Sequence, residues 1–489
     1  MTPPSAPNHT PNKTAAAFTC LVMSVSTLVG CVSAPETPRE PIADMPTQFS
    51  IAASPTAMPL SGKWWTSLKD PQLNSLIETA LTDNFSIKTA WARLDQSEAL
   101  LKQSTATLFP SLDASGRASR TRNEINSPAN PMQRAATTYS NTFSIGLTAS
   151  YEIDLWGRIR ANVSAADLDA QATAFDLQTA AISLSANIAN NWYNLITQAA
   201  QRDLLATQIQ TNLQQVDITR QRFNRGLVGA SDLLQQQQLL EATREQKARA
   251  DLQITLLENQ LAILLGKAPG SMTLNIPNTL IKLPNLPDTG LPTELLTRRP
   301  DLQAAFTRLQ ASNQRIAAAI ADQYPRLSIT ASGSTDSNRL RDLFDNWLAS
   351  IASNIAAPVF DADRRAATVQ QRKAQSQQNL FSYAQSTLQA LQDVEDSLAK
   401  EQFQRSILAS IRTQEDIAAQ VSDQLEQNYL KGAEDFLRVL TARQSLQNLQ
   451  RQRLTADRDL ILARINLCRA IAGPTPLTKP ADNPTQNNP

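Results

Sequence analysis

Histidine is almost absent from this sequence. Of 489 residues only His9 is a histidine, and it lies in a segment that we expect to be removed. The mature chain then has no imidazole for a catalytic triad, a zinc site or a general base near neutral pH. Cysteine is equally scarce, and Cys20, Cys31 and Cys468 do not form the pattern of a disulfide framework. Because phosphate-binding glycine motifs are also missing, the sequence predicts a protein that is not an enzyme and that has no metal or other cofactor.

Glycine, charge and aromatic residues are scarce as well. Glycine accounts for 13 of 489 residues, charged residues for 18% and aromatic residues for 5%, whereas average proteins contain about 7% glycine and about 25% charged residues. Few glycines mean few tight turns. Lysine and arginine number 45 against 44 acidic residues and form no basic stripe, which excludes a broad electrostatic grip on nucleic acid. This composition favours long, weakly charged helices.

The amino-terminal region has the pattern of an export signal. Residues 15–30 are apolar and uncharged, follow Lys13 and end in the letters LVG, directly before Cys31. This pattern predicts a secretory signal peptide. Around Cys31 the sequence resembles bacterial lipoprotein signals, in which the cysteine becomes the first residue and is acylated. The resemblance implies a lipoprotein signal peptide over 1–30 and lipidation at Cys31; an ordinary signal with a chance cysteine is the alternative.

Proline-rich segments follow the signal and close the chain. Prolines recur from 31 to 60 and again from 473 to 489. At this density they favour an extended backbone. We therefore expect a lipidated, proline-rich tether over 31–60 and a disordered tail over 473–489.

Two long segments without glycine or proline dominate the remainder. They predict helices at 158–226 and 363–431, each roughly 100 Å long at ~1.5 Å per residue. Helices of this length need lateral partners, as in a coiled coil or an α-barrel. Four shorter helices are predicted at 71–108, 231–266, 293–323 and 434–472. In each half of the chain the two short helices together match the length of one long helix.

The pattern changes to a period of two before each long helix. From Phe143 to Leu155 alternate residues are apolar, and the residues between them are small or polar. Strands are predicted at about 109–122, 140–156, 325–337 and 347–360. Strands of about ten residues are long enough to cross a bilayer with tilt. A soluble pair of hairpins packed on helices is the alternative.

The two halves of the chain repeat the same order of elements. Each half has a helix, two strands, a long helix, a glycine turn and a shorter helix. We expect a first repeat at 61–266 and a second at 293–472, separated by an equatorial linker at 267–292 that holds five prolines.

These elements together predict a membrane conduit. The mature chain has no run of 18 consecutive apolar residues, so no transmembrane helix is expected. Strands cross a membrane only as a closed barrel, of about eight strands or more, and this chain supplies four. The expected fold is therefore mostly α with a small membrane β part: a long-helix α-barrel and a transmembrane β-barrel that oligomerisation completes.

Three short motifs strengthen this interpretation: DLWGR at 154–158, RPD at 299–301 and YPRL at 324–327, together with turns that end at Gly226 and Gly432. Through them, residues 60–472 resemble the outer membrane factors of the TolC and OprM type, in the NodT-like lipoprotein group. The resemblance implies a homotrimer with a twelve-stranded barrel and a twelve-helix periplasmic tunnel.

The resemblance also implies a function and partners. We expect a passive exit duct of a tripartite efflux system, for drugs or other small molecules, anchored by lipid in the cell outer membrane. Its partners would be a periplasmic adaptor (membrane fusion) protein, an inner-membrane transporter and outer-membrane lipid. A type I protein-secretion duct is an alternative that the sequence does not separate. A non-conducting structural lipoprotein is a weaker one, because it needs no period-two strands.

Site residues follow from the same resemblance. The tips that contact the adaptor are expected to comprise Arg225, Gly226, Leu227, Lys431 and Gly432, and the glycines are at least helix C-caps.

The expected periplasmic gate consists of Asp232, Arg438 and Thr441. Relatives carry acidic residues at the last two positions, so a purely acidic gate is only partly supported. Asp232 and Arg438 are predicted to pair between neighbouring helices, with two solvated, unconnected side chains as the alternative. A second departure is the absence of the family's Gly-Gly pair after the last strand, where this chain has FDAD at 360–363. Cys468 is predicted to be a buried helix residue.

Overall fold

The computed structural model describes residues 45–51, 62–125 and 136–479. The predicted signal peptide, Cys31 and most of the tether therefore lie outside the described residues. The described chain forms two compact units: the first combines 96–170 with 307–380, and the second contains the rest. Each unit draws on both halves of the sequence, so the predicted repeats are not separate compact bodies.

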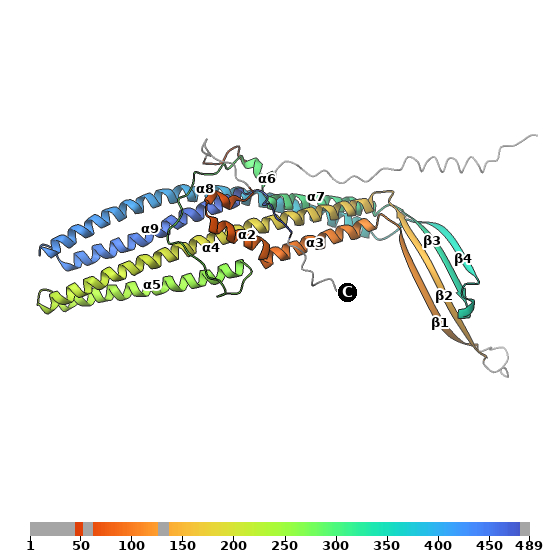
Figure 1. Ribbon diagram of the computed structural model, residues 1–489. Helices are drawn as coiled ribbons and strands as arrows, with labels where there is room; N and C mark the ends of the chain where they lie inside the picture. Colours follow the sequence, from red (N-terminus) through yellow and green to blue (C-terminus); the bar gives the residue numbers. More distant parts are fainter. Residues whose placement is uncertain (1–44, 52–61, 126–135, 480–489) are drawn as a thin grey trace, which may run out of the picture. The chain divides into compact units, whose positions relative to one another are not determined.

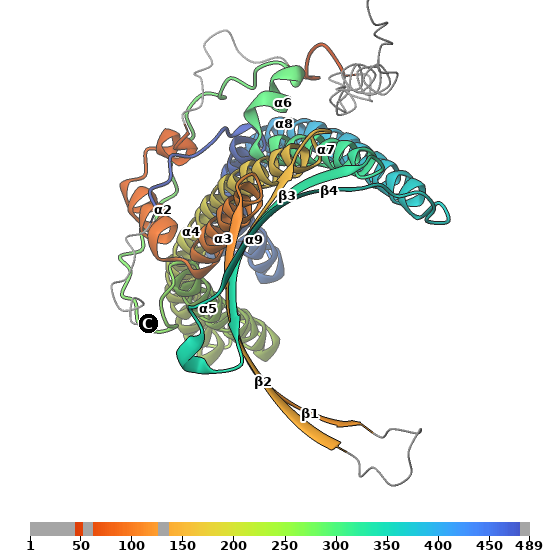
Figure 2. The ribbon, with the colours of Figure 1, turned by 90° about the vertical axis from the view of Figure 1, so that its right-hand side faces the viewer.

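The first unit contains a four-stranded antiparallel sheet in the order β1-β2-β3-β4. Its strands are β1 (Ser111–Ile125), β2 (Ala136–Ile153), β3 (Arg326–Ser337) and β4 (Trp347–Ala356), with a short 3-10 turn, η3 (Leu340–Asp342), between β3 and β4. Pairing between β2 and β3 ends at the row of Phe143 and Ser337. The β1–β2 hairpin continues beyond that row to Ile125 and Ala136, and Figure 2 shows it projecting past the curved sheet.

Long helices supply the remainder of the first unit. They are parts of α3 (Phe85–Ala106), α4 (Arg158–Asn224), α7 (Pro300–Ala321) and α8 (Arg364–Leu430). Small side chains let α4 and α7 approach closely, since Ala161, Ala317 and Ala318 form a buried cluster. Asn313 also accepts a hydrogen bond of 2.6 Å from the hydroxyl of Ser376. These contacts supply the lateral partners that helices of such length require.

The second unit contains two helical hairpins, which Figure 1 shows as α4 with α5 and α8 with α9. Helix α5 spans Ala230–Leu264 and α9 spans Phe436–Ile471. Shorter elements pack beside them: η1 (Trp64–Leu68), α2 (Pro71–Asp83), η2 (Pro292–Glu294) and α6 (Leu295–Arg298). No helix in the described residues is both long enough and apolar enough to span a membrane.

The main apolar core of the second unit is built around aromatic side chains. Trp64, Trp65 and Tyr193 have no exposed surface, and Trp192 is 1% exposed. Two of the indoles have hydrogen-bond partners: Trp192 donates a 2.9 Å hydrogen bond to Asp70 and Trp64 donates one of 3.0 Å to Ser185, whereas the buried indole nitrogen of Trp65 has none. Large buried rings contribute much of the stability of such a core through the apolar area that they bury.

A ladder of amide side chains joins α4, α5 and α9 elsewhere in the second unit. The amide of Asn212 donates to Thr243 over 3.0 Å and accepts from Gln447 over 3.1 Å. Gln208 donates to Gln450 over 2.8 Å. Asn212 is fully buried, and a buried amide needs such partners because leaving it unpaired costs about 1–3 kcal/mol. The glutamine-rich composition of the helices serves this packing.

Two predicted helices are interrupted. The helix expected at 71–108 breaks at Asn84, whose side-chain oxygen accepts from the amide of Ser86 over 2.7 Å and so caps α3. The helix expected at 293–323 breaks at Arg299, because Pro300 cannot continue a preceding helix but starts α7 readily.

The described parts of the predicted tether and of the predicted disordered tail are packed against the helices. Within 45–51, Phe49 is buried in an apolar cluster with Val394 and Leu467. In the tail, Thr475 is 1% exposed and its hydroxyl donates to the carbonyl of Gly62 over 3.1 Å. The described parts of both proline-rich segments therefore pack, because a single apolar side chain in one and a single hydroxyl side chain in the other contact the rest of the second unit.

Candidate functional site

The sheet of the first unit has one apolar and one polar face. Because side chains alternate along a strand, the pairing register aligns Leu112, Ala149, Ala331 and Ile351 in one row. The adjacent row consists of Asp113, Thr148, Ser332 and Ser350, in which the two serine hydroxyls lie 2.8 Å apart. The apolar face is exposed, with Leu147 51% and Ile351 78% accessible. Exposed apolar patches of this kind mark a surface that needs an apolar environment.

Both edges of this sheet are open within the described chain. Strands β1 and β4 each pair on one side only, and every residue of β4 is exposed. An open edge presents unpaired backbone donors and acceptors, which lipid cannot satisfy. The sheet is therefore incomplete as a single copy.

The DLWGR motif forms the junction between β2 and α4. Asp154 accepts hydrogen bonds from the amides of Ile159 over 3.1 Å and of Arg160 over 2.9 Å. Partial burial raises the pKa of Asp154, but these amides and the Arg160 side chain outweigh it, so the pKa lies below its ordinary value. Gly157 supplies the left-handed turn, with φ of +80°.

The YPRL motif meets this junction. The ring of Tyr324 stacks on Trp156 with 4.8 Å between the ring centroids. The indole of Trp156 also donates to the carbonyl of Pro325 over 2.7 Å. Two of the three motifs that define the resemblance therefore form one structural joint.

The second strand-to-helix junction, between β4 and α8, lacks glycine. Ala362 and Asp363 nevertheless have positive φ values of 50° and 63°. This conformation costs a non-glycine residue about 1–2 kcal/mol. The junction is held by an ion pair of 2.9 Å between Asp361 and Arg365. The chain therefore bends between β4 and α8 without the Gly-Gly pair that the resemblance led us to expect, and the bend carries backbone strain.

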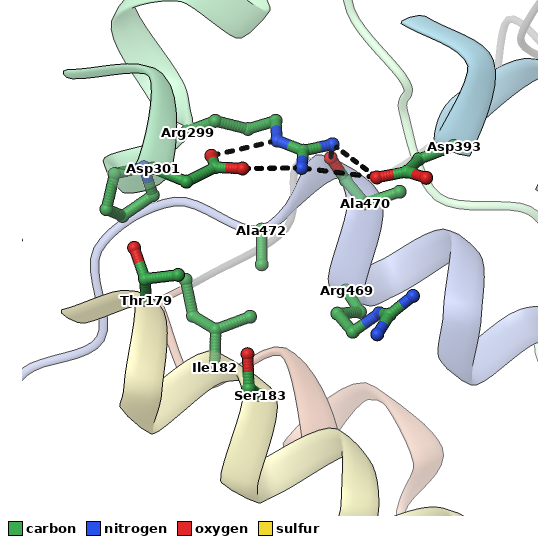
Figure 3. A pocket seen from close by; sticks show the side chains of 10 residues that line it. Thr179, Ile182, Ser183, Arg299, Asp301, Asp393, Arg469, Ala470 and Ala472 are labelled. Atoms are coloured by element: carbon green, nitrogen blue, oxygen red, sulfur yellow. Dashed lines mark hydrogen bonds and ion pairs between the residues drawn. The ribbon is translucent and has the colours of Figure 1, made fainter. Parts of the chain in front are cut away.

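The RPD motif forms a clamp in the second unit, shown in Figure 3. The guanidinium of Arg299 binds Asp301 over 2.7 Å, Asp393 over 3.3 Å and the carbonyl of Ala470 over 3.4 Å. Burial lowers the pKa of Arg299, but the two carboxylates outweigh it and raise the pKa. The clamp joins the start of α7 to α8 and to the end of α9. It adjoins a cavity of about 130 Å³.

The predicted tip residues form the two hairpin turns of the second unit. Gly226 and Gly432 have φ of +70° and +76°. In each turn the residue after the glycine donates back to the helix: Leu227 to the carbonyl of Arg222 over 2.9 Å, and Ala433 to that of Asn428 over 2.9 Å. Both turns are therefore Schellman C-caps. Arg225, Leu227 and Lys431 are exposed on these turns.

The predicted gate residues are not brought together within one chain. The guanidinium of Arg438 binds both carboxylate oxygens of Glu434, each over 2.8 Å. The hydroxyl of Thr441 donates to the carbonyl of Leu437 over 2.8 Å, and Asp232 is half-buried near the start of α5. Among the described residues no ion pair joins Asp232 to Arg438. A pair between copies of the chain stays a prediction.

Sequence reasoning missed an aromatic contact beside the tips. The guanidinium of Arg222 lies 4.3 Å from the ring centroid of Tyr429, and Phe436 packs against the same ring at 5.7 Å. Burial, together with Asp232 and Asp435, raises the pKa of Tyr429 although Arg222 opposes the shift. Arg222 lies four residues before Gly226 and Tyr429 lies three residues before Gly432. These similar positions were the signal from which the contact could have been predicted.

Comparisons with known proteins agree with this geometry. The family of outer membrane efflux proteins matches residues 76–267 and 291–473. The solvent efflux pump outer membrane protein SrpC of Pseudomonas putida is 29% identical over 432 residues, covering 87% of this chain and 89% of that protein. The cation efflux system protein CusC of Escherichia coli O6:H1 is 28% identical over 463 residues, with 91% and 96% covered.

Solved structures show the same fold. The outer-membrane channel OprN superposes with a TM-score of 0.81 at 25% identity, covering 91% of this chain and 99% of that one. A CusC structure gives 0.78 at 26% identity, covering 90% and 99%.

The chain belongs to the outer membrane efflux protein family. It is an outer-membrane efflux channel protein and not an enzyme. The resemblance and fold class predicted from the sequence are confirmed.

Proposed function

We propose that three copies of this chain close their sheets into one passage across the outer membrane, as the exit duct of a tripartite efflux system. The observation that carries the proposal is the sheet itself, with one apolar face, one polar face and two open edges. Joining β1 of one copy to β4 of the next satisfies both edges. The polar face then lines a wet passage and the apolar face meets lipid.

The height of the apolar face supports this placement. On β2 the apolar side chains run from Phe143 to Ile153, about 33 Å along a strand at ~3.3 Å per residue. At a tilt of about 40° this corresponds to a band about 25 Å tall, the thickness typical of outer-membrane barrels. Trp156 and Tyr324 lie just past one end of the band, and Trp347 and Tyr139 lie towards the other. Aromatic residues favour both membrane interfaces.

Two neighbouring residues of β2 test the orientation. Leu147→Arg puts a charge in the middle of the apolar face, where it costs about 2–4 kcal/mol, and should sharply reduce membrane insertion. Thr148→Arg puts the same charge on the polar face; it should insert normally and alter single-channel conductance. Equal insertion of both variants, or a monomeric mass in detergent for the parent, would refute the proposal.

The lipid anchor at Cys31 is part of the proposal. It rests on the signal-like sequence before that residue. Cys31→Ser should leave an unlipidated protein with weaker membrane association. Cys468→Ala is the matched control, because that thiol is 1% exposed and burial raises its pKa to about 12. Absence of a lipid label on Cys31 in the parent would remove the anchor.

The two tips are proposed to dock a periplasmic adaptor protein, which in turn engages an inner-membrane transporter. Their exposed cations and exposed Leu227 support this role, since these turns present side chains that no described neighbour covers. Arg225→Glu and Lys431→Glu should each lower efflux and adaptor crosslinking at unchanged trimer yield. Arg249→Glu is the control, because this exposed arginine lies well along α5 from the turn. Unaltered crosslinking in both tip variants would exclude the tips from the contact.

Asp232, Arg438 and Thr441 are proposed to surround the periplasmic mouth. In a trimer, Arg438 has two candidate partners: Glu434 on its own helix and Asp232 of another helix. If Asp232 and Arg438 hold the mouth closed, Asp232→Ala and Arg438→Ala should raise conductance in planar bilayers. Glu434→Ala should lower it, because it frees Arg438 for Asp232. Parent-like conductance in all three variants would show that other contacts close the mouth.

Small molecules are the proposed cargo. The names of relatives refer to solvents, toluene and cations, all of them small solutes. Deleting the gene and measuring sensitivity to a panel of organic solvents, antibiotics and metal cations tests this, with export of a large protein substrate as the contrary outcome.

A further inference from the structure

Two arginines extend the apolar face of the sheet at its far end. Arg120 and Arg122 occupy the positions of β1 that share a face with Leu112 and Ala118. They pair with Asn141 and Tyr139, beyond the row of Ala118 and Phe143 where the apolar residues end. Since α3 precedes and α4 follows the opposite end of this hairpin, the arginines lie at the end farthest from the helices of the first unit.

The guanidinium groups have little competing charge. Arg120 lies over the ring of Tyr139, with 5.0 Å between its guanidinium carbon and the ring centroid, and no carboxylate contact to it occurs among the described residues. Arg122 is 59% exposed and stands 3.9 Å from the carboxylate of Glu124, a separation at which an exposed pair contributes about 0–1 kcal/mol.

The height of these arginines places their guanidinium groups within reach of the headgroup layer of a bilayer. This step rests on the proposed membrane orientation of the sheet. Arg120 is two residues and Arg122 four residues past Ala118, or about 7 and 13 Å along the strand. At a tilt of about 40°, they stand roughly 5 and 10 Å above the apolar band. Headgroups occupy roughly the 5–7 Å outside the hydrocarbon core, so the backbone of Arg120 lies within this layer and that of Arg122 lies about 3–5 Å beyond it, a gap that its long side chain spans by reaching back.

We propose that Arg120 and Arg122 bind the phosphates of a multiply phosphorylated glycolipid of the lipid A type in the outer leaflet. A guanidinium binds phosphate through two parallel hydrogen bonds. Two guanidiniums about 7 Å apart on one strand repel each other, and a headgroup that carries more than one phosphate neutralises both. Tyr139 holds Arg120 in place and itself suits the interface.

Strand β1 provides a matched control. Arg117 lies on the same strand but on the polar face, in the row of Ser144 and Asp336. Arg120→Gln with Arg122→Gln removes the two charges from the apolar side, whereas Arg117→Gln removes one charge from the opposite side. A general effect of lost positive charge would appear in both variants.

The full chain is reconstituted in nanodiscs containing diphosphoryl lipid A, monophosphoryl lipid A or phosphatidylglycerol. The retained lipid is counted by native mass spectrometry after transfer to detergent. The parent should retain diphosphoryl lipid A at least about fivefold better than the double variant, as expected for losing charge-assisted contacts, and Arg117→Gln should match the parent. The parent should also retain monophosphoryl lipid A less well, a comparison that needs no substitution and so survives a variant that fails to fold.

Several outcomes would overturn the inference. Equal retention of diphosphoryl lipid A by the parent and the double variant would do so, as would equal losses in the double variant and Arg117→Gln. Equal discrimination with phosphatidylglycerol would replace the glycolipid with an anionic phospholipid. Conductance of the same nanodisc material after fusion to planar bilayers separates the two proposals. A parent that conducts but retains all of the lipids equally refutes only the lipid site. A parent that does not insert refutes the proposed channel.

Discussion

The two strand-to-helix junctions of the first unit perform the same turn by different means. At the first, Asp154 caps α4, Gly157 takes the positive φ and Trp156 stacks on Tyr324. At the second, Ala362 and Asp363 take positive φ without glycine, and Phe360 is 89% exposed. Both junctions have side-chain contacts, but the first places its positive φ at a glycine, whereas the second places it at two non-glycine residues and carries backbone strain.

The position of each junction explains the difference. The first lies beside β3 and the end of α7, so neighbouring residues of the same chain surround it. The second follows the edge strand β4, which pairs on one side only, and its contacts include the ion pairs of Arg365 with Asp361 and Asp322. A strained turn persists only when its surroundings hold it. In the proposed trimer, an adjacent copy at the open edge of β4 supplies further contacts to the second junction.

The largest expected effect comes from Trp156→Ala. It removes the stack on Tyr324 and the hydrogen bond to Pro325, and should lower the free energy of local opening by about 2–3 kcal/mol. Hydrogen exchange of peptides covering 155–165 measures this. Phe360→Ala at the second junction is the control and should change exchange at 358–368 little in isolated chains. A large effect of Phe360→Ala in the assembled protein would show that another copy covers that ring.

Asp154→Ala comes next. The substitution leaves the amides of Ile159 and Arg160 without their acceptor, which costs about 1–2 kcal/mol for a helix cap. Faster exchange should be confined to the first turn of α4. Unchanged exchange of these two amides would mean that the cap contributes nothing, and the contrast between the junctions would then rest on the aromatic stack alone.

Ala362→Gly should stabilise the second junction by about 1 kcal/mol, because glycine takes positive φ without the clash of a Cβ atom. Asp363→Gly should gain less, since aspartate tolerates this conformation better than alanine. Gly157→Ala is the matched control and should have the opposite sign. The readout is slower hydrogen exchange at 363–367 in Ala362→Gly than in the parent; faster exchange in that variant would show that the turn is not strained.

The smallest expected effect is the pH dependence of the first junction. The pKa of Asp154 lies below its ordinary value of 3.8 in the folded chain. Its contribution to stability is therefore fully present above about pH 4 and is lost as the pH falls through the folded pKa. Opening of the first turn of α4 should increase at low pH in the parent and be independent of pH in Asp154→Asn. The same acid response in both proteins would assign the effect to another group.

Much of this architecture was predictable because its signals are local. The absence of glycine and proline predicted two long helices at 158–226 and 363–431, and the structure has them at Arg158–Asn224 and Arg364–Leu430. Alternation predicted the strands. The break at Asn84 was missed because a cap inside a helical pattern acts through its side chain. The packing of Phe49 and Thr475 was missed because composition alone does not reveal long-range partners.

The candidate site divides in the same way. The tip glycines were predicted, since positive φ at a helix end favours glycine. The partner of Arg438 was not, because Glu434 on the same helix competes with any distant carboxylate and only geometry decides between them. The contact between the guanidinium of Arg222 and the ring of Tyr429 joins residues far apart in sequence, and no local pattern reveals such a contact.

The sequence by itself determined the helices, the strands, the turns and the two-faced character of the sheet, because periodicity and chain breakers act over a few residues. The tertiary structure decided which strands pair, that the compact units cut across the repeats, and that Arg299 clamps α7 to α8 and α9. It also decided that Arg120 lies over the ring of Tyr139 with no described carboxylate against it. These features depend on contacts between distant segments, whose geometry is set only when the whole chain has packed.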